Sequence, residues 1–384
     1  MKRIIYAIFI LTTSIANAQW TLVPSGTTAQ LDAMHFFDSN HGICSGAFTY
    51  ALTTSDGGAS WTMTGWQGLR DYSFVSLTEG YGASVVGNSM KVTTNGGTSW
   101  STITPPTSNS LWGVSAVSSS TAYFVGTGGV FWKTTNGGLT SSAGSSGTTT
   151  DLTDVVFTSA TTGFIVVQTG QIKMTTNSGS SWTTVHTQTG ALLTEMYFAD
   201  ANTGFCVGSG GLVLKTTNGG TSWTQLTTNS TSYLQGVHFF DDFNGIVVGT
   251  GGTILYTNDG GTTWYSLTSG TTEMLFEVRM LSPVSAVVSG ANGVILKNSN
   301  ISIGVDELSQ SRISVYPNPV STKLYIDSPD EIISINVYNA LGSLIHSLSG
   351  KTIFDSIDFS EQENGVYFIY LETRRGLIVK RVVR

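Results

Sequence analysis

The chain has 384 residues, of which 40% are hydrophobic and only 11% are charged. This low charged fraction argues against a disordered polyelectrolyte and against long helices held by ion pairs. With 17 basic and 24 acidic residues, the net charge of -7 argues against a protein that grips nucleic-acid phosphates, so no nucleic-acid partner is expected. The 45 glycines are typical of an all-β protein with many tight turns.

The N-terminus predicts a secretory signal peptide over residues 1–18. Lys2 and Arg3 precede an apolar run, and Ala16-Asn17-Ala18 matches an A-x-A cleavage site. The apolar run, residues 4–11, is too short to cross a bilayer, which needs about 20 residues. We therefore expect no transmembrane segment in the mature protein.

A motif of eight residues repeats through the middle of the chain. Its best copy is Thr216–Trp223, with the sequence TTNGGTSW. The tryptophan position falls at 61, 100, 141, 182, 223 and 264, with Ser141 replacing the tryptophan in one copy, so the spacings are 39, 41, 41, 41 and 41 residues. Short strands divided by Gly, Asn or Asp precede each copy. This period is typical of a four-stranded propeller blade.

The two ends of the repeat region complement each other. Trp20 lies one period before Trp61, and the residues around it read as a fourth strand without a blade. The last repeat, around Val294–Asn298, lacks its tryptophan and its fourth strand. Pairing these two ends removes an exposed sheet edge. We therefore predict a seven-bladed β-propeller over residues 19–304, closed by the N-terminal strand.

The repeated turn fits the pattern Ser/Thr-x-Asp/Asn-x-Gly-x-Ser/Thr-Trp, which resembles the Asp box of bacterial neuraminidase repeats. Several copies carry a neutral asparagine at the Asp position, so we interpret the box as a structural turn and its tryptophan as an apolar plug between blades. The residues concerned are Asp56, Trp61, Asn95, Trp100, Asn136, Asn177, Trp182, Asn218, Trp223, Asp259 and Trp264.

The complete repeat, strand-Gly-strand followed by Lys-Thr-Thr-Asn-Gly-Gly-x-Ser-Trp, is similar to the photosystem II stability and assembly factor propellers. The resemblance covers residues 20 to about 304 and implies the propeller fold. Plant and cyanobacterial members of that family meet their partners through basic patches. Here residues 19–304 contain two arginines and five lysines against 14 acidic residues, so that role is not expected.

The C-terminal part differs in composition from the repeats. Residues 305–311 read as a polar linker, and residues 312–384 read as a small β-sandwich. Its blocks VYPNP, VYNALG and NGVYF and its basic final strand resemble the type A C-terminal sorting domain of the type IX secretion system. The motif residues are Pro317, Asn318, Pro319, Gly365 and Lys380.

This second resemblance implies where the protein is located. It implies a source in the Bacteroidota, passage through the periplasm, and contact between residues 312–384 and the type IX secretion machinery. The protein would then be secreted or displayed on the outer-membrane surface.

One column of residues stands out among the first strands of the repeats. Aligned on their apolar pattern, these strands place Ala33, Ser73, Gly113, Asp154, Glu195, Gly236 and Glu277 near the mouth of the central channel. The three carboxylates could bind a cation or supply an acid and a base. Tyr72, Trp112 and Phe276 could stack on sugar rings. The alternative is a solvated rim without a role.

The sequence favours recognition over catalysis, because short connections leave little material for an enclosed active site. We expect a monomeric binding or adhesion module for an extracellular glycan or protein. The alternative is a glycoside hydrolase or lyase that uses the channel carboxylates. No histidine or cysteine spacing predicts a metal site, and no cofactor is expected.

Overall fold

The computed structural model describes residues 20–46, 50–66, 68–103, 109–301, 313–328, 331–340, 343–349, 356–373 and 376–384. The predicted signal peptide, residues 1–18, and the predicted linker, residues 305–311, lie outside the described residues. Among the described residues, no helix is both long and apolar enough to span a membrane.

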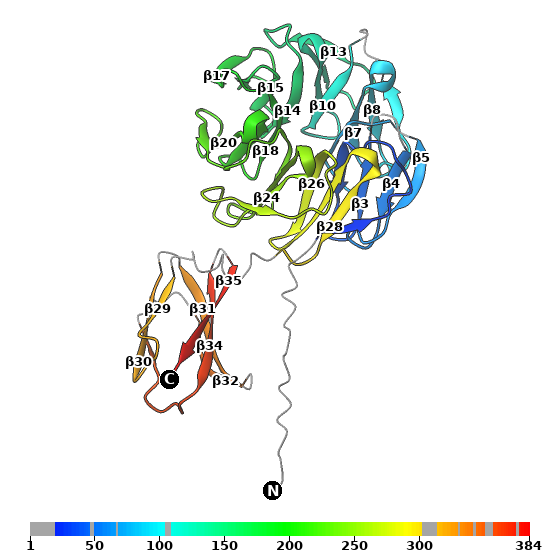
Figure 1. The fold of residues 1–384 in the computed structure, drawn as a ribbon. Coiled ribbons are helices and arrows are strands. Elements are labelled where there is room, and N and C mark those ends of the chain that lie inside the picture. The colour runs from blue at the N-terminus through cyan, green and yellow to red at the C-terminus, as the bar shows by residue number, and fades with distance from the viewer. Residues whose placement is uncertain are drawn as a thin grey trace.

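Seven four-stranded antiparallel sheets follow one another from the first described strand to Asn298, and we call each of them a blade (Figure 1). Blade 1 contains β2 (Ala33–Phe36), β3 (Gly42–Ser45), β4 (Tyr50–Thr54) and β5 (Thr62–Trp66). Blade 2 contains β6 (Asp71–Phe74), β7 (Gly80–Ser84), β8 (Ser89–Thr93) and β9 (Ser101–Ile103). Blade 3 contains β10 (Leu111–Ala116), β11 (Ala122–Gly126), β12 (Val130–Thr134) and β13 (Ser142–Ser145).

Four further blades complete the domain. Blade 4 contains β14 (Leu152–Phe157), β15 (Gly163–Val167), β16 (Gln171–Thr175) and β17 (Thr183–Thr187). Blade 5 contains β18 (Leu193–Phe198), β19 (Gly204–Gly208), β20 (Val213–Thr216) and β21 (Thr224–Leu226). Blade 6 contains β22 (Leu234–Phe239), β23 (Gly245–Gly249), β24 (Ile254–Thr257) and β25 (Tyr265–Leu267). Blade 7 contains β26 (Leu275–Ser282), β27 (Ser285–Gly290), β28 (Ile295–Asn298) and β1 (Thr21–Val23).

Five short 3-10 turns join second to third strands. They are η1 (Val86–Asn88), η2 (Thr127–Gly129), η3 (Ser209–Gly211), η4 (Thr250–Gly252) and η5 (Ala291–Gly293).

The blades form a closed ring around a central channel. The first strand of each blade contacts the first strand of the next, and β26 of the last blade contacts β2 of the first. The ring is closed as predicted, because β1 pairs with β28 in the register Leu22↔Leu296. The prediction of an all-β propeller is therefore confirmed.

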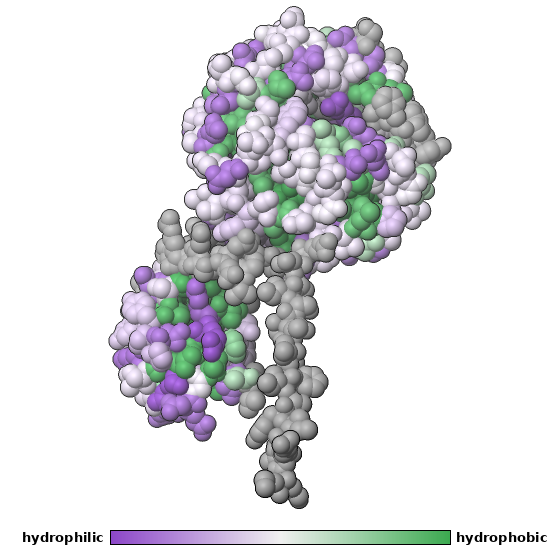
Figure 2. Space-filling model, in the orientation of Figure 1, coloured by the Kyte–Doolittle hydropathy of each residue, from purple (hydrophilic) through white to green (hydrophobic). Residues whose placement is uncertain are grey.

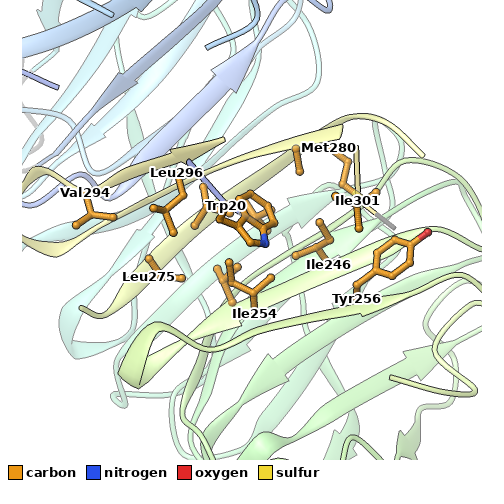
Figure 3. Close-up of a cluster of buried hydrophobic side chains, with 13 residues drawn as sticks. Trp20, Ile246, Ile254, Tyr256, Leu275, Met280, Val294, Leu296 and Ile301 are labelled. Atoms are coloured by element: carbon orange, nitrogen blue, oxygen red, sulfur yellow. The ribbon is translucent and has the colours of Figure 1, made fainter. Parts of the chain in front are cut away.

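Trp20 fills the gap between the last two blades. Its side chain is 3% exposed and packs in a cluster with Ile246, Ile254, Leu275 and Leu296 (Figure 3). These partners come from β23, β24, β26 and β28, so one aromatic ring from the start of the chain joins blades 6 and 7. Apolar area is thus buried at the point where the ring closes.

Hydrogen bonds within the repeated turn explain why both Asp and Asn occur there. The Oδ1 of Asp56 and the Oδ1 of Asn95 each accept the backbone N–H four residues ahead, at 2.9 Å. With Asp56, the hydroxyl of Ser60 donates to Oδ2. With Asn95, Nδ2 instead donates to the hydroxyl of Ser99. A hydroxyl can donate or accept, so either residue satisfies the turn.

The C-terminal part is a two-sheet sandwich, as predicted. One sheet contains β29 (Ser314–Tyr316), β30 (Lys323–Asp327) and β33 (Ser356–Asp358). The other sheet contains β31 (Ile332–Asn339), β32 (Leu344–Ser349), β34 (Val366–Thr373) and β35 (Gly376–Val383). Buried aliphatic and aromatic side chains from both sheets, such as Leu324 and Ile369, form its core.

The motif residues of this sandwich hold the last residues of the chain. Asn318, between the exposed Pro317 and Pro319, donates to the carbonyl of Arg381 and accepts the N–H of Val383, at 3.0 and 2.9 Å. Gly365 exchanges two backbone hydrogen bonds with Arg384. Lys380 lies in β35 opposite Ile369 of β34.

Candidate functional site at the channel mouth

Four carboxylates from four blades surround the channel. In β14, β18 and β26 these are Asp154, Glu195 and Glu277, as the sequence alignment predicted. The fourth is Asp71, at the start of β6. Asp71 pairs with Ala83, as Asp154 pairs with the equivalent Val166, so the two aspartates hold the same place in their blades.

The sequence alignment was therefore wrong for blade 2, where it placed Ser73 in this column. Ser73 is followed by two apolar residues, which mimics the start of the neighbouring first strands. Its pairing with Tyr81 places it two residues deeper in the channel than Asp71. There, its hydroxyl accepts the backbone N–H of Ala116 in the next blade, at 2.9 Å.

The channel carboxylates join neighbouring blades. Asp71 accepts the N–H of Val114, and Asp154 accepts the N–H of Met196, each at 2.8 Å. Glu195 accepts the N–H of Val237 at 3.2 Å. Innermost strands have no further strand to pair with, so their inward N–H groups need side-chain acceptors. A structural role for these carboxylates follows directly.

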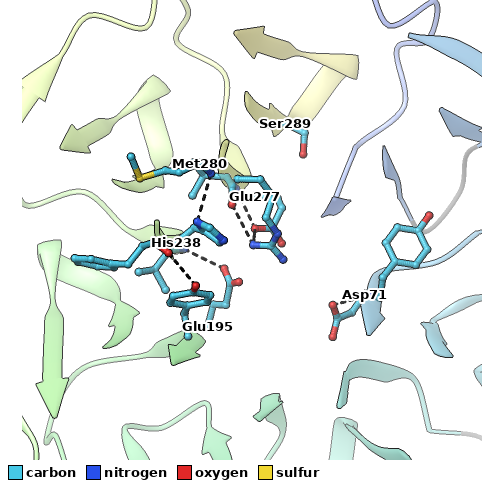
Figure 4. Close-up of polar contacts among 12 residues, drawn as sticks. Asp71, Glu195, His238, Glu277, Met280 and Ser289 are labelled. Carbon is cyan, nitrogen blue, oxygen red and sulfur yellow. Dashed lines mark hydrogen bonds and ion pairs between the residues drawn. The ribbon is translucent and has the colours of Figure 1, made fainter. Parts of the chain in front are cut away.

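Glu277 is held differently. Its Oε1 lies 2.8 Å from Nη1 of Arg279 and also accepts the N–H of Val278 (Figure 4). Burial raises the pKa of Glu277 to about 7, although Arg279 lowers it. Burial likewise raises the pKa of Asp154 to about 6 and that of Asp71 to about 8, so near pH 7 part of this ring is uncharged.

A cavity of about 170 Å³ lies above these carboxylates and receives side chains from all seven blades. Each blade has one position equivalent to Asp71 or Asp154. The residue directly before that position lies in the first strand or just ahead of it, and it lines the cavity. These seven residues, which we call the upper ring, are Asp32, Arg70, Trp112, Thr153, Thr194, Gln235 and Phe276. Gln168 and Tyr233 also line it. The sequence analysis named only Trp112 and Phe276 of the upper ring.

Arg70 is the main cation of the upper ring. Its guanidinium lies 4.6 Å from the centre of the Trp112 ring, within range of a cation–π interaction. The backbone N–H of Arg70 donates to the carbonyl of Ala83. Its guanidinium forms no hydrogen bond or ion pair with another residue in the described part of the chain. Burial lowers the pKa of Arg70, and Asp32 and Asp71 act in the opposite direction. Its side-chain donors therefore line the cavity without a partner among the described residues.

Tyr72 does not belong to this cavity, contrary to the sequence prediction. Successive side chains of a strand point to opposite faces, so Tyr72 points away from the channel where Asp71 points into it. The Tyr72 ring stacks on Trp100 with centroids 5.9 Å apart, and its hydroxyl donates to Ser45. With 7% of its surface exposed, Tyr72 is part of the contact between blades 1 and 2.

The carboxylates at the base of the cavity are largely buried. Asp154 and Glu277 are 9% and 6% exposed. Further along the first strand of blade 6, His238 accepts the N–H of Met280 at 3.3 Å (Figure 4). We call this cavity the pit. Within the described residues, no group of three or more His, Cys, Asp or Glu side chains is arranged to hold a metal ion.

Comparison with known proteins agrees with this architecture. The sequence profile of the photosynthesis system II assembly factor YCF48 matches residues 12–149, 147–231 and 174–271. The profile of the secretion system C-terminal sorting domain matches residues 314–384. No curated protein sequence matches the chain.

Three solved structures show the fold of the propeller. YCF48 bound to a D1 peptide is 20% identical, covers 73% of this chain and 94% of its own, and has a TM-score of 0.61. YCF48 from Cyanidioschyzon merolae is 22% identical, with coverage of 73% and 98% and a TM-score of 0.61. The GH74 enzyme of Niastella koreensis is 16% identical, with coverage of 94% and 67% and a TM-score of 0.64.

The tail match indicates export by the type IX secretion system to the cell surface or beyond. The propeller match spans more than half of the sequence. By its repeats, its closed ring and these matches, the chain belongs to the photosynthesis system II assembly factor YCF48 family and carries a secretion system C-terminal sorting domain.

Proposed function

We propose that this protein is an exported recognition module that binds an extracellular glycan or protein at the mouth of its propeller channel. The observation that carries this proposal is the pit itself, where every blade contributes a side chain and polar groups lie beside aromatic rings. Convergent polar groups within a concave, partly aromatic surface are typical of ligand sites.

The surface outside the pit is that of a domain exposed to water. The visible face is mostly pale or purple, with green apolar patches between (Figure 2). A polar surface of this kind is expected of a domain that works in water. The peptide-bound YCF48 structure shows that one protein of this fold binds a peptide, which supports a protein ligand here as one of the two options.

The contacts of the carboxylates favour binding over hydrolysis. A glycoside hydrolase needs one carboxylic acid and one carboxylate that are free to act on the substrate. Asp154 already accepts two backbone N–H groups, and Glu277 is paired with Arg279. These contacts would have to break or be shared during catalysis.

One observation favours the alternative of a glycoside hydrolase. Burial raises the pKa of Glu277 to about 7, which would suit a general acid at neutral pH. Hydrolysis would release reducing ends from a bound glycan, and Glu277→Gln would abolish that release. Binding without release would leave recognition as the function.

The test is a binding screen of the purified, exported protein. A glycan array and an array of extracellular peptides are probed with the natural protein and with Arg70→Ala and Phe276→Ala. Leu139→Ala is the matched control, because Leu139 is 83% exposed in a turn after a third strand, at the opposite face from the pit. We expect binding that both pit variants weaken and the control retains. Equal binding by all four proteins, or none, would refute the proposal.

A further inference from the structure

We infer that the pit holds one uncharged sugar residue, the terminal residue of a glycan that enters end-on. This inference rests on the proposed function and selects one of its two ligand classes. It follows from the size of the pit and from the donors and acceptors on its wall.

The size of the pit restricts the ligand to a small group. Pockets for drug-sized ligands occupy roughly 300–1,000 Å³, and this pit measures about 170 Å³. A pit of this size has room for one terminal unit of a chain against the wall formed by the upper ring, and the rest of the ligand must stay outside.

The wall offers both donors and acceptors to this terminal unit. The guanidinium of Arg70 and the side-chain amide of Gln168 have no hydrogen-bond partner within the described residues. Across the pit, the carboxyl groups of Glu195 and Glu277 supply acceptors. Sugar hydroxyl groups donate and accept, so they can satisfy both kinds of group at once. A peptide carboxylate or a lone ammonium group would satisfy only one kind.

The charge of the wall also favours a neutral ligand. Arg70 lies near Asp32 and Asp71, and Glu195 and Glu277 line the pit from other blades, so an ion of either sign meets a like charge. Burial raises the pKa of Asp71 to about 8, which leaves this carboxyl group protonated near neutral pH, and burial also raises the pKa of Glu195. A protonated carboxyl both donates and accepts, as a hydroxyl does.

Aromatic side chains complete the recognition surface. Trp112, Tyr233 and Phe276 line the pit from blades 3, 6 and 7. Arg70 already covers one face of Trp112, at 4.6 Å from the ring centre. Phe276 and Tyr233 therefore remain as the apolar surface against which the C–H face of a sugar ring can pack.

The test measures binding of defined small probes to the exported protein by saturation-transfer NMR and calorimetry. The probes are the methyl glycosides of glucose, galactose, mannose, fucose and N-acetylglucosamine, together with glucuronate, glucosamine and a set of free and amidated pentapeptides. We expect at least one neutral glycoside to bind. A trisaccharide that ends in the same sugar should bind about as tightly as the methyl glycoside, because only the terminal residue enters the pit.

Variants connect this binding to the pit. Arg70→Met keeps an apolar stem against Trp112 and removes the donors, and Gln168→Ala removes the free amide. Each should weaken binding of the glycoside by about ten- to a hundredfold, the loss expected for a buried hydrogen bond. Leu139→Ala should bind normally, and circular dichroism should be equal for all variants.

The outcomes separate this inference from the proposed function. Tighter binding of glucuronate or glucosamine than of any neutral sugar would overturn the neutral-ligand inference. Peptide binding that depends on Arg70, without sugar binding, would overturn it and leave the proposed function in place. If no probe binds and the arrays are also negative, both fail.

Discussion

The carboxylate of Asp154 accepts the backbone N–H of Met196, 42 residues further along the chain, at 2.8 Å. Its other oxygen accepts the N–H of Val155 at 2.7 Å. Asp154→Ala therefore leaves two N–H groups without acceptors at a blade contact, and we expect it to lower the free energy of unfolding by about 1–3 kcal/mol per group.

Asp154→Asn is the matched variant, because the amide oxygen still accepts a hydrogen bond and the side chain keeps its size. Urea denaturation followed by tryptophan fluorescence measures both variants. The structural role of Asp154 would be contradicted if the alanine variant unfolded at the same urea concentration as the natural protein.

The stability of the propeller should fall as the pH rises from 7 to 9. Burial first, and the nearby Asp154 second, raise the pKa of Asp71 to about 8 from 3.8. The folded state thus holds a proton that the unfolded state has lost, so stability decreases with rising pH until Asp71 ionises. The buried histidines do not disturb this window, since burial lowers the pKa of His35 to about 3 and also lowers that of His238.

Asp71→Asn is the control for this pH effect. It keeps an acceptor for the N–H of Val114 but cannot ionise. We expect urea midpoints that decline from pH 7 to 9 in the natural protein and decline less in the variant. Parallel curves for the two proteins would show that Asp71 is not the group that titrates.

The repeat sequence predicted the fold because its regular spacing reflects one repeated physical unit. Each turn needs glycine at positive φ, such as Gly97 at +80°, and each turn needs an Asp or Asn acceptor. These requirements recur in the first six blades, so they leave a visible pattern. The pairing of Trp20 with the last blade followed from the same spacing.

The candidate site was only partly predictable, because its residues share a position and not a chemistry. Asp32, Arg70 and Trp112 occupy equivalent places in three blades. No pattern in the sequence links such different side chains until the strand register is known. The strand register shows that Asp71, and not Ser73, lies at the position of the channel carboxylates. Because side chains alternate along the strand, Tyr72 points away from the pit.

Asp259→Asn should be tolerated in the repeated turn. Asp259 accepts the N–H and the hydroxyl of Thr263, at 2.8 and 2.7 Å. Asn218 meets the same needs elsewhere by donating to the hydroxyl of Ser222. We expect Asp259→Asn to change the unfolding free energy by less than about 0.5 kcal/mol, and Asp259→Ala to lower it by about 1–2 kcal/mol. Equal losses in both variants, measured by thermal denaturation, would contradict this role of the hydroxyl.

The terminal arginine should stabilise the sorting domain. Arg384 donates to the carbonyls of Ser321, Ser360 and Gln362. Without the guanidinium, these carbonyl groups lose their hydrogen-bond donor. Arg384→Ala should therefore speed hydrogen exchange in peptides from residues 313–384, measured in the full chain. Exchange in peptides from the propeller should not change. Arg381→Ala, on an exposed side chain of the same chain end, is the control. Unaltered hydrogen exchange in Arg384→Ala would refute the prediction.

Truncation of Trp20 should weaken the closure of the whole ring. The side chain is 3% exposed and packs against residues of blades 6 and 7, such as Ile246 and Leu296. We expect Trp20→Ala to lower the unfolding free energy by about 3–5 kcal/mol, the usual effect of removing a buried aromatic side chain. Leu22→Ala is the matched control, because Leu22 lies on the same strand but is 64% exposed. It should change stability by less than about 0.5 kcal/mol.

Deleting the strand that Trp20 precedes tests closure itself. Without residues 20–25, the outer edge of β28 loses its partner in β1, and the seam between blades 6 and 7 loses its aromatic plug. Because the open ring would expose a sheet edge and an apolar seam, we expect one sharp transition in calorimetry to become broad or to disappear. If the deletion variant and Trp20→Ala both melted as the natural protein does, the ring would owe its stability to contacts between the inner strands and not to the N-terminal strand.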